Sequence, residues 1–96
     1  MEPSKISKEL LKISVSGNAK VKNEALTQLI VVWKASETLN NSLQTLTIKV
    51  LHKLSGDPTS TSEERMKEII EIGVRKFGVE FAQKISDNDR LSIFIE

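Results

Sequence analysis

The chain has 96 residues, of which 39% are hydrophobic and 28% are charged, with 4 Gly, 2 Pro and no Cys. This length favours a single domain over residues 1–96, and the composition excludes a disordered or low-complexity chain. The lack of cysteine excludes a disulfide scaffold, a thiolate metal site and a cysteine nucleophile. The net charge is only +1, whereas nucleic-acid-binding proteins carry a clear excess of Lys and Arg over Asp and Glu, so no nucleic-acid partner is expected.

The first predicted helix spans residues 4–16, with Ser4 as its N-cap. Apolar residues at spacings of four and three define one expected inner face: Ile6, Leu10 and Ile13. Gly17 and Asn18 then predict the end of this helix, in the left-handed conformation that is common at helix C-termini.

The second predicted helix starts at Lys20, and its apolar residues cover a wide arc, which is typical of a helix buried on much of its girth. These residues are Val21, Ala25, Leu26, Leu29, Ile30, Val32 and Trp33. Trp33 lies in the densest apolar run and is predicted to belong to the core. Asn40, Asn41 and Ser42 favour turns over helix interiors, so we expect a break there.

A third helix is predicted over residues 42–54, because its apolar residues recur at helical spacing: Leu43, Leu46, Val50 and Leu54. His52 and Lys53 lie in its last turn, where the helix dipole favours cations, and Gly56 follows. The sequence therefore predicts a loop over residues 55–59.

Two overlapping capping boxes, in which Ser60 and Thr61 each precede a glutamate by three residues, predict the start of a fourth helix. Its expected inner face is formed by Met66, Ile69, Ile70, Gly73 and Phe77. Gly73 favours either close helix packing or a kink. The helix is expected to end before the acidic turn at residues 87–89, with Phe81 as a candidate extension beyond Gly78.

No internal repeat and no flexible linker occurs, so we expect an all-α fold: an antiparallel up-down four-helix bundle with a C-terminal segment packed on it. This part of the sequence is unusual because all three phenylalanines, together with several aliphatic residues, lie in the last fifth of the chain. It either folds back over the bundle or forms a docking surface, and the two are compatible. The candidate partner-binding residues are Phe77, Phe81, Arg90, Leu91, Ile93, Phe94 and Ile95.

Catalytic chemistry is not predicted, because the chain has one histidine, no cysteine and no tyrosine. Paired carboxylates at Glu63 and Glu64, next to Arg65 and Lys67, are interpreted as a solvated helix face. His52 has no second ligand at helical spacing and is interpreted as a helix C-terminal cation or a pH-sensitive contact. We therefore expect a protein that is not an enzyme and needs no metal or cofactor.

Charge is unevenly distributed along the chain. Residues 1–34 carry a net charge of +3, and all of their positively charged residues are lysines. Residues 63–96 carry a net charge of −2. The basic N-terminal third is either a solvated face or a peripheral contact with anionic lipid. The N-terminus has no apolar signal region, and the longest apolar run, residues 29–33, is too short to span a bilayer. A cytoplasmic location, with contact at the inner face of the cell membrane as an option, is expected.

Two stretches, KELLKISVSGNAKVKNEALTQLIVVWKASETL and TSEERMKEIIEIGVRKFG, resemble the immunity proteins of pediocin-like (class IIa) bacteriocins, in particular the enterocin A immunity family. The first is similar to that family's first two helices. The second is similar to its fourth helix, with the pattern S-E-E-x-x-K-x-I-I-x-I-G.

The resemblance implies a small cytosolic four-helix bundle of a Gram-positive bacterium that protects the cell and catalyses no reaction. It implies action on the mannose phosphotransferase permease once the bacteriocin has engaged it. In that family the C-terminal half recognises the toxin, which here corresponds to the fourth helix and the tail, from Phe77 to Ile95.

An alternative is a histone-fold-like or other helical subunit of an obligate complex, with helices over residues 5–16, 20–54 and 60–72. Its long central helix would have to be continuous through Asn40, Asn41 and Ser42, and it would expose apolar surface that a second chain must cover. The missing basic stripe weighs against this alternative. A small enzyme is the third and weakest candidate, because no catalytic set is found.

Overall fold

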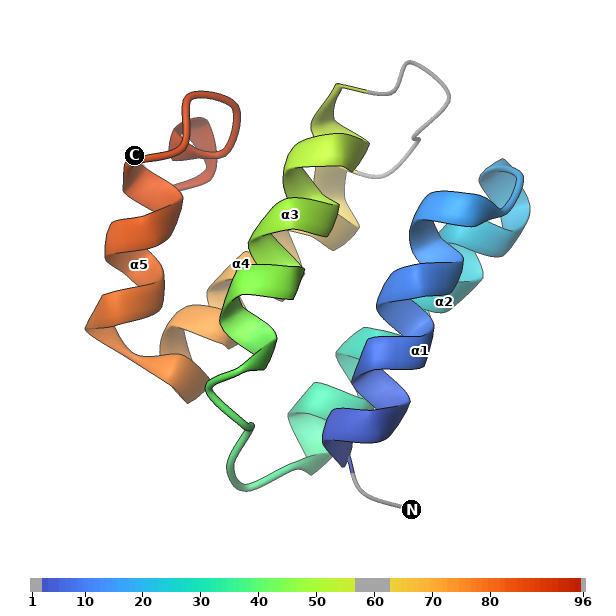
Figure 1. The fold of residues 1–96 in the computed structure, drawn as a ribbon, viewed down its shortest axis with the longest axis horizontal. Coiled ribbons are helices and arrows are strands. Elements are labelled where there is room, and N and C mark those ends of the chain that lie inside the picture. Colours follow the sequence, from blue (N-terminus) through green and yellow to red (C-terminus); the bar gives the residue numbers. More distant parts are fainter. Residues whose placement is uncertain (1–2, 57–62, 96) are drawn as a thin grey trace.

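The computed structural model describes residues 3–56 and 63–95, which form five α-helices and one short 3-10 helix (Figure 1). They are α1 (Pro3–Ser16), α2 (Ala19–Ala35), α3 (Leu43–Ser55), α4 (Glu63–Phe77), α5 (Val79–Ser86) and η1 (Ser92–Phe94). The predicted all-α class is confirmed for this part of the chain. The predicted capping residues Ser60 and Thr61, and the loop beyond Gly56, lie outside the described residues.

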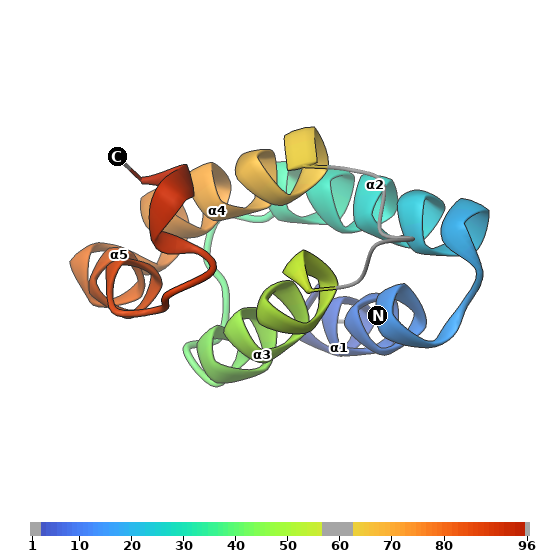
Figure 2. The ribbon, with the colours of Figure 1, turned by 90° about the horizontal axis from the view of Figure 1, so that it is seen from above.

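The helices form two layers, with α1 and α3 in one, α2 and α4 in the other, and α5 beside α4 (Figure 2). This arrangement gives a flat molecule of 33 × 30 × 18 Å, as expected when two helical layers share one core. No described helix is long and apolar enough to cross a membrane. The largest side chains that are completely buried are Trp33, Phe81, Leu11, Leu29, Leu43, Leu51, Ile69, Ile85 and Leu91.

The inner face of α1 differs from the prediction, because its buried residues are Ser7, Leu11 and Ser14. Ile13, expected inside, is 41% exposed. The buried Ser7 hydroxyl oxygen accepts a hydrogen bond of 2.9 Å from Trp33 Nε1 of α2. A buried indole N–H needs such a partner, and small serines let α1 approach α2 closely.

The turn between α1 and α2 also differs from the prediction in its conformation. Gly17 does not have a positive φ, so the expected left-handed cap is absent. Asn18 instead acts as the N-cap of α2, with its side-chain oxygen accepting a hydrogen bond of 3.0 Å from Val21 N. At the other end of α1, the helix already begins at Pro3, so Ser4 lies inside the first turn rather than at the cap.

The predicted break between the second and third helices is confirmed, since α2 ends at Ala35 and α3 begins at Leu43. Asn40 supports the turn with its side-chain oxygen, which accepts a hydrogen bond of 2.9 Å from Ser42 N. The continuous central helix required by the histone-fold-like alternative is therefore not present.

The predicted fourth helix is divided at Gly78, where φ is 91° and ψ is −160°. Only glycine adopts this conformation readily, because a Cβ would clash with the backbone. The chain therefore turns after Phe77 and forms α5, a second short helix in the region where one longer helix was expected. Gly73 remains inside α4 and permits close packing rather than a kink.

Candidate functional site

The C-terminal region rests on an aromatic cluster. The ring of Phe77 packs edge-on against Trp33, with centroids 5.7 Å apart, and lies 5.2 Å from the ring of Phe81. Phe81 and Trp33 are fully buried and Phe77 is half-buried. These rings join α2, α4 and α5, so the two candidate partner-binding residues Phe77 and Phe81 serve as the base of the site.

The turn after α5 is fixed to the end of α3. Asn88 accepts backbone hydrogen bonds at its side-chain oxygen from Arg90 N (3.0 Å) and Leu91 N (3.2 Å), and His52 Nδ1 lies 3.1 Å from the same oxygen. The Arg90 guanidinium donates to the carbonyl oxygen of His52 at 3.3 Å and lies over Gly56. Arg90 therefore caps α3, where a cation favours the helix dipole, and Leu91 is fully buried.

Among the predicted partner-binding residues, the aliphatic ones that are exposed lie in and beside η1. Ile93 is 63% exposed, Ile95 is 37% exposed, and Phe94 is half-buried. Phe94 and Ile95 border a depression of about 710 Å³ between α4 and α5, which we name the C-terminal groove. It is lined by Lys67, Ile70, Glu71, Val74, Arg75, Ala82, Phe94 and Ile95.

The C-terminal groove has an apolar floor and a charged border. Ile70 and Val74 of α4 form the floor with Ala82 of α5, and Lys67 and Arg75 provide cations along α4. Apolar anchors surrounded by charged residues are typical of a surface that binds another protein. The geometry therefore suits docking of an apolar segment.

The predicted site residues thus divide into three groups: a buried base, the α3 cap Arg90, and the residues in and beside η1. Phe81 and Leu91 belong to the core, Arg90 caps α3, Ile93 and Ile95 are exposed, and Phe94 is half-buried against the core. Sequence reasoning missed the α4 cations and Val79, which is 84% exposed at the start of α5. The spacing of Phe81 and Ile85, four residues apart after Gly78, was the available signal for a separate helix.

Within residues 3–56 and 63–95, no three His, Asp or Glu side chains are placed to hold a metal ion. His52, the only histidine, contacts an amide oxygen and not a nucleophile. Comparisons with protein-family models, with curated proteins and with solved structures found no match to this chain.

Proposed function

We propose that this protein is a non-catalytic bacteriocin immunity protein that protects its cell from a pediocin-like bacteriocin. It acts from the cytosol on the mannose permease engaged by the toxin, and it recognises this complex through α4, α5 and η1. The proposal draws on the resemblance of residues 8–39 and 61–78 to the enterocin A immunity family.

The observation that carries the proposal is a pair of exposed aliphatic residues in and beside η1, Ile93 and Ile95, which we name the rim. Both are exposed on a segment that Leu91 anchors in the core. Exposed aliphatic residues on a fixed base are suited to binding, because docking would cost little conformational entropy. The C-terminal groove beside them offers space for a partner's apolar side chains.

The proposal includes a finer description of the architecture. In it, α1 to α4 act as the antiparallel up-down four-helix bundle, and α5 with η1 is the C-terminal segment packed on it. The contacts of α5 with α4, α3 and η1 support this division. The basic N-terminal third is proposed to make a peripheral contact with anionic lipid at the inner face of the membrane, since Lys5, Lys8 and Lys12 are all exposed.

The test is expression in a bacteriocin-sensitive Gram-positive strain, challenged with a panel of pediocin-like bacteriocins beside an empty-vector strain. We expect selective survival against one or two toxins. The double variant Ile93→Asp, Ile95→Asp places charges on the rim, and we expect it to lose protection at unchanged protein level and unchanged helical circular dichroism.

The matched control is Val31→Asp, which charges an aliphatic residue of α2 that is 56% exposed and lies outside the C-terminal groove. It should protect as the unmodified protein does. Leu91 is unsuitable for this test because it is buried, so its truncation would also lower stability. Uniform sensitivity of the strain across the panel, with the protein present, would contradict the proposed function.

A further inference from the structure

One face of α4 stays open between the contacts that this helix makes with α2 and α5. On the α2 side, Arg65 donates a hydrogen bond of 2.7 Å to the hydroxyl of Thr27. On the α5 side, Gly73 lies under the ring of Phe81. The residues of α4 between these two contacts are exposed or border the C-terminal groove: Glu63, Lys67, Ile70, Glu71, Val74 and Arg75.

Four charged residues follow this open face, each about one helical turn from the next. They are Glu63, Lys67, Glu71 and Arg75, all of them exposed, and we name them the α4 charge stripe. Their signs alternate along the helix, and Glu64 adds a second carboxylate at the Glu63 end. In the part of the chain that the structure describes, no ion pair or side-chain hydrogen bond engages these four residues. Exposed neighbours one turn apart attract one another only weakly, so the stripe can pair with another surface.

The α4 charge stripe is complementary to a second copy of itself. Two identical helices related by a two-fold axis pack either parallel, with each residue opposite its own copy, or antiparallel. Parallel packing would place like charges opposite each other. Antiparallel packing with the axis beside residue 69 places Glu63 opposite Arg75 of the second copy and Lys67 opposite Glu71 of the second copy. Symmetry repeats both pairs, so every charge of the stripe faces a charge of opposite sign.

Apolar side chains lie directly beside the α4 charge stripe. Ile70 and Val74 form the floor of the C-terminal groove, and Phe94 and Ile95 border it on the side of η1. Ile93, the other residue of the rim, is 63% exposed on the same segment. An interface between two copies uses the same patch on both, so it would bury this apolar surface twice.

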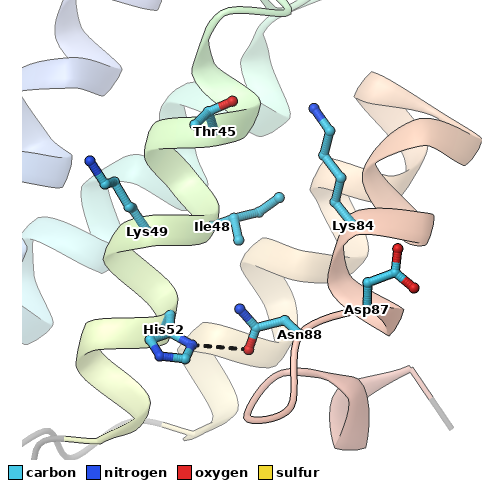
Figure 3. Close-up of a pocket in the computed structure, with 7 residues that line it drawn as sticks. All are labelled: Thr45, Ile48, Lys49, His52, Lys84, Asp87 and Asn88. Atoms are coloured by element: carbon cyan, nitrogen blue, oxygen red, sulfur yellow. Dashed lines mark hydrogen bonds between the residues drawn. The ribbon is translucent and has the colours of Figure 1, made fainter.

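The segment that carries the rim is held in a fixed position. Figure 3 shows the contact of 3.1 Å between His52 Nδ1 of α3 and the side-chain oxygen of Asn88, in the turn before η1. The same oxygen accepts hydrogen bonds from Arg90 N and Leu91 N, and Leu91 is buried. A surface that is already ordered loses little conformational entropy on association, which favours even a small interface.

The alternation of sign distinguishes between kinds of partner. A nucleic acid or an anionic lipid surface presents one sign of charge, so it would attract Lys67 and Arg75 but repel Glu63 and Glu71. A protein helix with the opposite alternation at the same spacing satisfies all four charges. Read in the reverse direction, α4 of a second copy is such a helix.

We propose that this protein forms a two-fold symmetric dimer in which the α4 helices of two copies pack antiparallel through the α4 charge stripe. The dimer goes beyond the proposed immunity function and does not depend on it, because it needs neither toxin nor permease. The stripe borders the C-terminal groove, so a second copy and the partner of the proposed function compete for this face. We expect a weak dimer, with a dissociation constant in the high micromolar range, because the interface is small and its ion pairs are exposed.

The test is sedimentation equilibrium of the full chain at low and high salt. We expect a monomer–dimer equilibrium that shifts to monomer as salt screens the charges. Two double variants, Lys67→Glu with Arg75→Glu and Glu63→Lys with Glu71→Lys, give the stripe a single sign. Each variant alone should lose about tenfold or more in association constant, because every pair becomes repulsive. An equimolar mixture of the two should form a heterodimer, which also shows that both variants are folded.

The matched control is Lys5→Glu with Lys8→Glu, which changes the net charge equally on the exposed side of α1. It should dimerise as the original protein does and should not associate with the Glu63→Lys, Glu71→Lys variant beyond the level of that variant alone.

Four outcomes would overturn the proposal. They are a monomer at millimolar concentration in low salt, undiminished dimerisation of either stripe variant, no association in the mixture, and equal association of the α1 control with the basic variant. A monomeric protein that protects against a toxin, and loses protection in Lys67→Glu with Arg75→Glu, would assign this face to the partner of the proposed function instead. A dimer in a protein that protects against no toxin would support the dimer and contradict only the proposed function.

Discussion

Phe81 packs its ring directly over Gly73. A Cβ built on Gly73 would lie 2.6 Å from ring carbon Cε2 of Phe81, closer than real Cβ contacts allow. The ring is fully buried against Phe77 and cannot swing outward. Gly73 thus sets how closely α5 approaches α4, and through α5 it positions the C-terminal groove.

Gly73→Ala is therefore expected to destabilise the protein, although alanine favours helix by about 1 kcal/mol. Overpacking of a rigid core costs about 1–3 kcal/mol, and the buried ring places this position near the upper end. We expect a net loss of about 1–2 kcal/mol in the free energy of unfolding, measured with urea. In a double-mutant cycle, Phe81→Leu should reduce the cost of Gly73→Ala. An additive cycle would contradict this contact.

Gly78→Ala tests the backbone conformation between α4 and α5 without a change in tertiary packing, since no atom beyond the adjacent residues lies within 4 Å of a Cβ at this position. At φ 91° and ψ −160° an L-residue is strained, and we expect destabilisation of about 1–3 kcal/mol. A chemically synthesised chain with D-alanine at residue 78 should fold as well as the original. Equal stability of the L- and D-alanine forms, measured by thermal unfolding, would show that the two helices can join differently.

Ser7→Ala should leave the Trp33 indole N–H buried without a partner, at a cost of about 1–3 kcal/mol. Because Trp33 is the only tryptophan, its fluorescence reports the unfolding transition directly. Ser14→Ala is the matched control, since the Ser14 hydroxyl is equally buried but bonds only to a carbonyl of its own helix, Leu11 O. We expect a smaller loss from Ser14→Ala. Equal losses would mean that the indole hydrogen bond contributes nothing specific.

Asn88→Ala should release the turn after α5, because its side-chain oxygen is the acceptor for two backbone N–H groups and for His52. The expected loss is about 1–3 kcal/mol in the free energy of unfolding, with NMR shifts at Leu91 and along η1. Asn88→Asp preserves the acceptor and should retain most of the stability. If both variants behave alike, the side-chain oxygen does not hold the turn.

The proposed lipid contact predicts binding to vesicles that contain anionic lipid, in a manner that weakens with salt. Replacing Lys5, Lys8 and Lys12 with glutamine should reduce binding in a co-sedimentation assay, since each lysine near the surface contributes about 1 kcal/mol. Replacing Lys49, Lys53 and Lys67 removes the same charge elsewhere and should have a smaller effect. Equal losses from the two triple variants would indicate attraction by net charge alone.

The positions of most helices were predictable from the sequence. Helical periodicity is local, so Leu29 and Trp33 of α2, and Ile69 and Ile70 of α4, were correctly predicted as buried. The break at Asn40 to Ser42 was predictable for the same reason, because it depends on the turn preferences of the residues in it.

The candidate site was predictable only as a segment. The sequence indicated an unusual apolar C-terminus, but nothing local distinguishes Leu91, which is buried, from Ile93, which is exposed. That difference depends on the turn that Asn88 holds against His52, 36 residues away along the chain. Arg90 was predicted to be a binding residue, whereas the fold places its guanidinium over the end of α3.

The sequence alone therefore determined the all-helical class, most core residues of α2 and α4 and the break before α3, because each depends on neighbours within a few turns; Val21 of α2, predicted among the apolar residues, is exposed. Tertiary structure decided which face of α1 is buried, since Trp33 needs the hydroxyl of Ser7 and not the side chain of Ile13. It also decided that α5 separates at Gly78 and returns over Gly73, because close approach of two helices is a property of both surfaces together.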